Sequence, residues 1–376
     1  MAQADIGAST LIRHLGLEGA AGALRGHTAP DAEYAQGVIL MLRAIEKLWQ
    51  TRIAHGLNGP ILRLPVLAAP LPHAPGQITL PAIDAQGMLQ TYIDDLARAR
   101  AHLEAIPPGI EPELVIDVDD IWLDLDGDGQ RGIEESAAHV LAAMMLTPQE
   151  LAAFHRIEHN ADIRLARFHL DAADMWWLLG RNRINSAFAE FAMAWPLVQL
   201  GTELSREAGE RTVSASEYID RAWDLASLPP EPARVQAARD HALQGIAAMR
   251  NFLNELAREK DDNHEFLPGP GQSAPYRRRV DEGDHTRWMA ILDQGEQLLR
   301  GQLLHHNPRR DPPGMGLDFA AWIDNPTRVP IQEWLSGGTQ LEHLKEGPLD
   351  NFELWEEFKL FLQGRLNSWL ILDGMH

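Results

Sequence analysis

Residues 31–54 read DAEYAQGVILMLRAIEKLWQTRIA, and this stretch decides the class of fold. Its large apolar side chains recur three or four positions apart, at Tyr34, Val38, Leu42, Ile45, Trp49 and Ile53. That spacing places them on one face of an α-helix, because a helix turns once in about 3.6 residues. Asp31 is a residue type that caps the first free amides of a helix, so the stretch predicts a helix over 31–54.

The same spacing recurs along most of the chain. Further helices are expected over residues 84–106, 134–145, 171–195, 216–228, 232–260, 284–304 and 351–372, with another opening at Thr147. Extended segments are few and short, at 114–118, 121–123 and 163–170. We therefore expect an all-α fold, a multi-helix bundle of about nine helices with a minor extended element.

The loops between these segments suit one continuous domain. We expect residues 1–30 to form an N-terminal segment and residues 31–376 to form a single helical domain. A sub-boundary is expected near 228–232, where Pro229, Pro230 and Pro232 interrupt the helical period.

Acidic side chains outnumber basic ones, at 54 Asp and Glu against 33 Lys and Arg, which gives a net charge of −21. A field of this sign repels phosphate backbones and anionic lipid heads, so we expect no nucleic-acid partner, and any partner to be a protein or a small molecule. No stretch approaches ~18 consecutive apolar residues, so we expect no membrane span. The chain has no cysteine, which excludes disulfides and thiolate metal sites. Metal chemistry is left to oxygen and imidazole ligands.

The segment 124–135 reads DLDGDGQRGIEE and satisfies the twelve-position pattern of an EF-hand loop. Oxygen donors stand at positions one, three and five, as Asp124, Asp126 and Asp128, and Glu135 stands at position twelve. Calcium takes six to eight oxygen ligands, which these carboxylates and the carbonyl of Gln130 would supply. Gly129 at position six permits the sharp reversal of the backbone. The sequence predicts a Ca²⁺ site here.

Two departures from the usual hand predict a structural role for this ion. Position eight, normally an apolar residue that pairs with a second loop, is Arg131. The entering side, 115–123, alternates or is aspartate-rich and indicates a strand or a short turn, whereas 134–145 on the exit side has one apolar helical face. A solitary loop of this kind is expected to staple a fold and not to act as a cooperative sensor.

These motifs carry a resemblance. The chain resembles an uncharacterised family of exported bacterial all-helical proteins with one EF-hand-like DxDxDG calcium loop. The similar residues are 123–135, the stretch DAADMWWLLG at 171–180, WLSG at 334–337, EGPL at 346–349 and Trp355. The resemblance covers most of the chain beyond Asp31 and implies no activity. Where relatives carry tyrosine, cysteine and histidine after the glycine, this chain has Arg181, Asn182 and Arg183.

A competing motif is HRIEH at 155–159, an H-x-x-E-H pattern. On a helix, His155 and His159 share a face, so both could bind Zn²⁺ while Glu158 served as general base. The alternative function is therefore a zinc-dependent hydrolase, with Asp162 as a further ligand of a second metal site. A solvated polar helix face explains the same residues more simply, because 16 histidines make a chance match easy.

The residues Ala2-Gln3-Ala4-Asp5 resemble those that follow a signal-peptide cleavage site, which predicts a periplasmic or extracellular protein with its signal peptide removed. Together these features lead us to expect an exported calcium-binding protein, a binding or structural protein and not an enzyme.

Overall fold

The computed structural model describes residues 7–55, 84–132, 135–137, 139, 167–195, 228–263, 265–269, 271–272, 282–309, 311–328 and 344–356. Several expected segments lie outside these residues. They are the helix from Thr147, the helix over 216–228, most of the helices over 134–145 and 351–372, and the HRIEH segment. Within the described part of the chain the fold is mostly helical, with seven α-helices and one 3-10 helix, against the nine or so helices expected for the whole.

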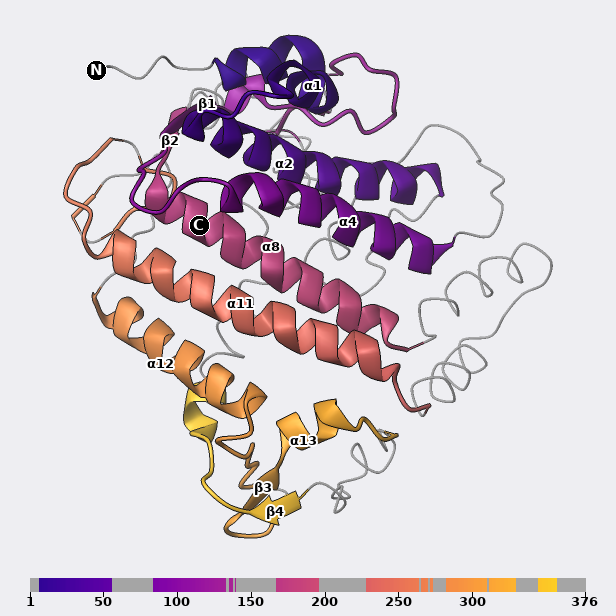
Figure 1. Ribbon diagram of the computed structural model, residues 1–376, viewed down its shortest axis with the longest axis vertical. Coiled ribbons are helices and arrows are strands. Elements are labelled where there is room, and N and C mark those ends of the chain that lie inside the picture. The colour runs from indigo at the N-terminus through magenta and orange to yellow at the C-terminus, as the bar shows by residue number, and fades with distance from the viewer. Residues whose placement is uncertain are drawn as a thin grey trace, which may run out of the picture.

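Four long helices form the body of the molecule. They are α2 (Pro30–Ala54), α4 (Ala85–Glu104), α8 (Ala172–Met193) and α11 (Pro232–Leu256). They stack in that order, each against the next, and α12 (Glu282–Leu299) packs on the outer side of α11 (Figure 1). The helical periods of 31–54, 84–106, 171–195, 232–260 and 284–304 are thus confirmed.

Two of the expected caps are present, but Asp31 does not cap α2: that helix begins at Pro30 after Ala29, without a side-chain cap, and Asp31 lies buried in its first turn. Asp84 accepts a hydrogen bond from the amide of Gly87 at 2.8 Å, which caps α4. Asp171 caps α8 by accepting from the amides of Ala173 at 2.7 Å and Asp174 at 3.1 Å. Prolines occupy the first turn of α2 and α11, where no intrahelical amide is needed. A side-chain cap such as Asp84 or Asp171 typically contributes about 1 kcal/mol to the stability of its helix.

Residues 8–24 form a helix that the sequence pattern did not indicate. This helix, α1 (Ala8–Leu24), is kinked at Gly16, whose φ of 66° lies in the left-handed region. The kink divides the apolar residues into two short sets, so no single helical period runs through the segment. Ile12 and Leu17 are nevertheless fully buried.

The extended elements are minor, as expected. Strand β1 (Leu114–Asp117) pairs antiparallel with β2 (Arg167–Leu170), with Ile116 opposite Phe168. A 3-10 turn, η1 (Val118–Asp120), follows β1 and leads into the predicted calcium loop. A second antiparallel pair, β3 (Met315–Leu317) and β4 (Leu344–Glu346), lies beside α13 (Phe319–Asp324) at the far end of the molecule (Figure 1).

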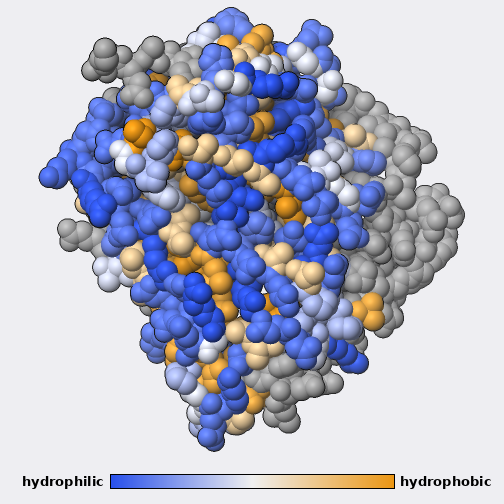
Figure 2. Space-filling view, in the orientation of Figure 1, coloured by the Kyte–Doolittle hydropathy of each residue, from blue (hydrophilic) through white to orange (hydrophobic). Residues whose placement is uncertain are grey.

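The main core lies between α1, α2, α4, the β1–β2 pair and α8. Trp49 and Leu96 are fully buried there, and each such side chain contributes about 1.5–3 kcal/mol of transfer free energy. A smaller cluster that includes Phe252 and Leu292 joins α11 to α12. On the face seen in Figure 2 the described residues are largely hydrophilic, with apolar residues in small separate patches. No helix among the described residues is both long and apolar enough to cross a membrane.

Candidate metal centre

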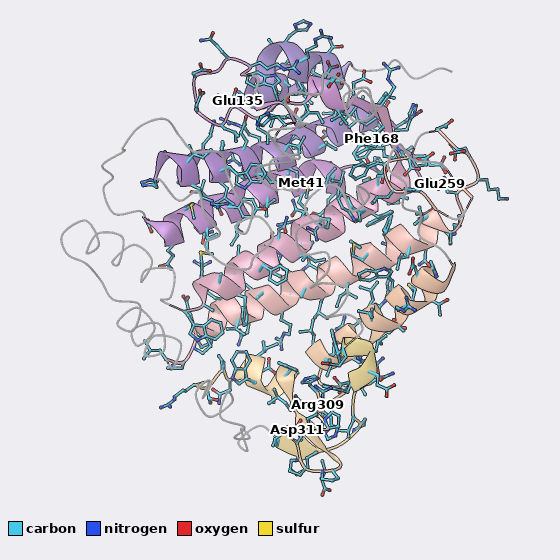
Figure 3. The ribbon with its side chains drawn as sticks, turned by 180° about the vertical axis from the view of Figure 1, so that it is seen from behind. Met41, Glu135, Phe168, Glu259, Arg309 and Asp311 are labelled. Carbon is cyan, nitrogen blue, oxygen red and sulfur yellow. The ribbon has the colours of Figure 1, made fainter. Side chains whose placement is uncertain are left out.

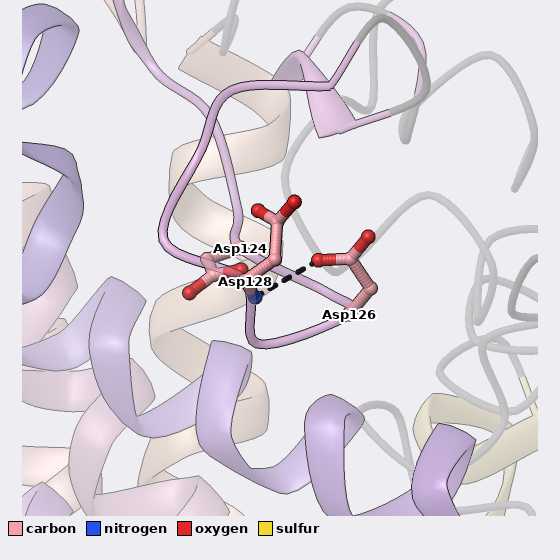
Figure 4. A group of neighbouring side chains, drawn as sticks. All are labelled: Asp124, Asp126 and Asp128. Carbon is pink, nitrogen blue, oxygen red and sulfur yellow. Dashed lines mark hydrogen bonds between the residues drawn. The ribbon is translucent and has the colours of Figure 1, made fainter.

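Three of the five predicted ligands come together in the loop after η1. One carboxylate oxygen from each of Asp124, Asp126 and Asp128 lies within 4.8 Å of the other two (Figure 4). Asp124 is half-buried, and the other two are exposed. Three carboxylates at this spacing repel one another in the absence of a cation, and they form an all-oxygen donor set of the type that calcium and magnesium prefer.

The backbone of the loop is held by the same carboxylates. Asp124 accepts hydrogen bonds from the amides of Gly127 at 2.9 Å and Gly129 at 3.2 Å, one with each oxygen. Both glycines have positive φ, 78° and 72°. A side chain at either position would be strained by the backbone alone, because no atom lies within 4 Å of the Cβ that it would add. The turn that brings the three aspartates together thus depends on glycine at both places.

Two further amides follow the same pattern. The amide of Asp128 donates to Oδ1 of Asp126 at 3.1 Å, the bond drawn in Figure 4. The amide of Gln130 donates to Oδ1 of Asp128 at 2.7 Å, and Gln130 itself is exposed. Each of the three aspartates therefore accepts a backbone amide inside the loop while also contributing to the group of carboxylates.

Glu135 is placed differently from the three aspartates. Its carboxylate is buried and accepts three amides of the loop: Oε1 from Leu125 at 2.7 Å and Asp126 at 3.3 Å, and Oε2 from Gly132 at 2.7 Å. Burial raises the pKa of Glu135 above its usual range, and these amides oppose the rise. In this arrangement the buried carboxylate of Glu135 holds the backbone of the loop through three amide hydrogen bonds. As an ion ligand it would exchange some of these amides for the metal.

Helix α2 fixes the first residue of the loop. The amide of Asp124 donates to Oε1 of Glu46 at 2.6 Å, and the side-chain amide of Gln50 donates to the carbonyl of Asp124. Glu46 is only 1% exposed and forms an ion pair with Arg43. Burial raises the pKa of Glu46, while Arg43 opposes the rise. Since α2 lies over 70 residues earlier in the chain, sequence spacing gave no signal for these contacts.

The two flanks of the loop are joined by a short ladder. The amide of Leu123 donates to the carbonyl of Glu135 at 2.9 Å, and Ala137 donates to Ile121 at 3.0 Å. Between them Trp122 pairs antiparallel with Ser136. The expected extended segment at 121–123 is therefore present as an isolated bridge.

Helix α1 supports the loop from the other side. The indole of Trp122 donates to the carbonyl of Ile12 at 2.8 Å, and its ring lies against Gly16, where an added Cβ would come within 3.0 Å of it. The kink of α1 is thus the place that receives the tryptophan. At the rim of the loop, Arg131 at position eight donates to the carbonyl of Asp119. The side chain that replaces the usual apolar residue is bound within its own chain.

A second acidic group was not indicated by any motif. Asp171, Glu259 and Glu265 also offer carboxylate oxygens within 4.8 Å of one another. The helix-cap role of Asp171 was readable from the sequence, but its neighbours come from a segment about 90 residues later, so only the packing of the helices reveals the group.

His155, Glu158, His159 and Asp162, the residues of the competing zinc site, lie outside the described residues. Comparisons of the chain with protein-family models, with curated proteins and with solved structures found no match.

Proposed function

We propose that this protein binds calcium in the loop 124–135 and that the ion acts mainly as a structural staple. The observation that carries the proposal is the convergence of Asp124, Asp126 and Asp128 within 4.8 Å on a turn fixed by two glycines of positive φ. Such a turn presents oxygen donors before any ion arrives, which lowers the ordering cost of binding.

The chemistry of the donors favours calcium. Carboxylate and carbonyl oxygens are hard ligands, and the loop provides no nitrogen or sulfur donor. Calcium accepts six to eight oxygens in irregular geometry, whereas magnesium requires a near-octahedral shell and keeps its waters. With Glu135 as a fourth carboxylate, a filled site has a net charge of about −2, which a dication reduces from about −4.

The contacts of the loop support a staple and not a sensor. Asp124 is bound to α2, Trp122 to α1, and the two flanks to each other, so an ion would tie together segments that are already packed. Sensor EF-hands work as pairs whose helices open on binding. Here position eight, the place of the pairing contact, is Arg131 bound to Asp119.

We further propose that the protein works outside the cytosol. Solitary EF-hand-like loops of extracellular modules bind calcium with Kd of roughly 10⁻⁴–10⁻³ M, so they fill only where calcium is millimolar.

The test is metal analysis of the chelator-treated protein after dialysis against calcium and zinc together. The proposal expects one calcium ion at the loop, and the Asp126→Asn, Asp128→Asn variant should lose that ion. The variant Asp119→Asn, which changes an acidic neighbour outside the three-carboxylate group, should retain it. Stoichiometric zinc that is lost in His155→Ala, with no calcium bound, would support the zinc hydrolase in its place. No observation on the described residues favours that second function.

A further inference from the structure

The second acidic group lies where β2 and α8 meet the end of α11. Asp171 follows β2 and caps α8, and it is half-buried like Glu259, which follows α11. Glu265 is only 3% exposed, and its segment is bound to β2 by the amide of Phe266, which donates to the carbonyl of His169 at 3.3 Å. Figure 3 shows Glu259 near the end of α11, well away from Glu135 in the calcium loop.

A fourth carboxylate, Asp174, is buried in the first turn of α8, three residues after Asp171. Asp174 is 2% exposed, and its Oδ1 has no hydrogen-bond partner. Its amide donates to Oδ1 of Asp171, so the two residues share the first turn of α8. Burial raises the pKa of Asp174 well above its usual range, and the negative charges of Asp171 and Glu265 raise it further.

The hydrogen bonds of the group leave oxygens available. Backbone amides bind Oδ1 of Asp171, and the amide of Asn263 binds Oε1 of Glu265 at 3.0 Å. The side-chain amide of Gln272 donates to Oε2 of Glu259 at 3.1 Å. These bonds use one oxygen of each carboxylate. Among the described residues none donates to the second oxygen of these carboxylates, so it is open to a ligand together with the unpartnered Oδ1 of Asp174.

No basic side chain neutralises these carboxylates within the described part of the chain. No lysine or arginine among the described residues, which leave out 273–281, forms an ion pair with Asp171, Asp174, Glu259 or Glu265. Burial raises the pKa of both Asp171 and Glu265, and the negative charge of a further acid, Asp261, adds to the rise. Buried carboxylates are normally paired, protonated or bound to a metal, because an unpaired buried charge is unfavourable.

We propose that Asp171, Glu259 and Glu265, with the buried and unpartnered carboxylate of Asp174 three residues after Asp171, form a second cation site, which takes one calcium ion and clamps the start of α8 to the chain that leaves α11. The donors are all oxygen, the ligand type that calcium prefers. This proposal uses none of the residues of the 124–135 loop, so the two sites can succeed or fail independently.

The experiment counts calcium on the full chain. Chelator-treated protein is dialysed against calcium from micromolar to millimolar, and bound calcium is measured per chain for the wild type, for Asp126→Asn with Asp128→Asn, and for Asp174→Asn with Glu265→Gln. Asp261→Asn serves as the matched control, since it removes a neighbouring charge outside the group of four. We expect two calcium ions in the wild type and the control, and one in each double variant.

Each result decides between the sites. If Asp174→Asn with Glu265→Gln binds as much calcium as the wild type, the second site is overturned. If that variant loses its only calcium while the loop variant retains one, the second site stands and the loop proposal fails. Displacement of its calcium by an equal concentration of magnesium would overturn the choice of ion.

A luminescence measurement tests the second site without the Asp174→Asn, Glu265→Gln variant, so it does not depend on whether that variant folds. Trp177 lies one turn beyond Asp174, and its ring centroid is 5.4 Å from that of Phe266, next to Glu265. In the Asp126→Asn, Asp128→Asn protein, terbium at the second site is expected to show tryptophan-sensitised emission that calcium displaces. Trp177→Phe should lower this emission several-fold, and emission that does not change, or no emission at all, would contradict the site.

Discussion

Removal of the charge of Asp126 and Asp128 should abolish the part of calcium's stabilising effect that the loop provides. In the structure Asp126 and Asp128 are exposed, and each accepts a single backbone amide through Oδ1. An asparagine keeps an oxygen for that bond, so Asp126→Asn with Asp128→Asn should leave the stability of the calcium-free protein within about 0.5 kcal/mol of the wild type.

The size of the effect follows from linkage. Binding to the native state alone stabilises by about 2.7 kcal/mol at a hundredfold excess of ligand over Kd, which is about 10 mM calcium for a Kd of ~10⁻⁴ M. An unfolding entropy of about 2.1 cal/mol/K per residue over 376 residues is roughly 0.8 kcal/mol/K. The loop's share of the calcium-dependent rise in Tm is therefore roughly 3 °C.

Glu135→Gln should behave differently, which makes it a useful partner in the same assay. A glutamine has one acceptor oxygen where Glu135 receives three amides, and its NH₂ group would face a donor. The calcium-free protein should lose about 1–3 kcal/mol, roughly 1–4 °C in Tm, in addition to losing the calcium effect.

The assay is thermal unfolding followed by circular dichroism, with chelator and with calcium, for the wild type, both variants and Asp119→Asn as the acidic control. Equal Tm values for wild-type protein in chelator and in calcium would refute the reasoning, since either the loop is empty or its occupancy does not couple to folding. An unchanged calcium shift in Asp126→Asn with Asp128→Asn would place the ion elsewhere.

Three further outcomes are expected. Terbium bound in the loop should be sensitised by Trp122, two residues before the first ligand, be displaced by calcium and fall sharply in Trp122→Phe; full emission in that variant contradicts the placement. In chelator, Gly129→Ala should lower the free energy of unfolding by about 1–2 kcal/mol, because φ is 72° at this position. The control Gly22→Ala in α1, where an added Cβ meets nothing within 4 Å, should leave the free energy of unfolding unchanged or raise it; denaturant unfolding measures both, and equal values for the two variants would contradict the role of Gly129. Burial and the charges of Arg100 and Arg183 lower the pKa of His241 from 6.5 to about 4, so the folded state resists the proton that the unfolded state takes up. Stability should fall as the pH drops from 6.5 toward 4, and His241→Gln should reduce that fall in unfolding free energies measured across this range; an equal fall in both proteins would show that His241 does not contribute.

The sequence predicted well those features that are encoded locally. The long helices could be placed because their apolar residues repeat in one period, and three of their starts because Asp84 and Asp171 cap the helices and Pro232 opens one; Asp31 was wrongly expected to be a cap, since Pro30 begins that helix. The three aspartates of the loop could be grouped because residues two apart on a tight turn point toward one centre.

The features that escaped prediction depend on long-range packing. Helix α1 was missed because Gly16 breaks its period, and that kink makes sense only once Trp122, over 100 residues later, is seen lying against it. The support of Glu46 for the amide of Asp124, and the meeting of Asp171 with Glu259 and Glu265, likewise require the folded arrangement of helices.

The contact between α2 and the loop has a consequence for protein engineering. The loop 124–135 is not a self-contained module, because the backbone of its first residue, Asp124, is held by Glu46 and Gln50, which lie 78 and 74 residues earlier in the chain. A peptide of residues 122–137, or the same segment grafted into a foreign host, would carry the three aspartates without the partners that hold Asp124. Transplantation of this site would therefore require two positions of α2 to be rebuilt in the host beside the twelve of the loop.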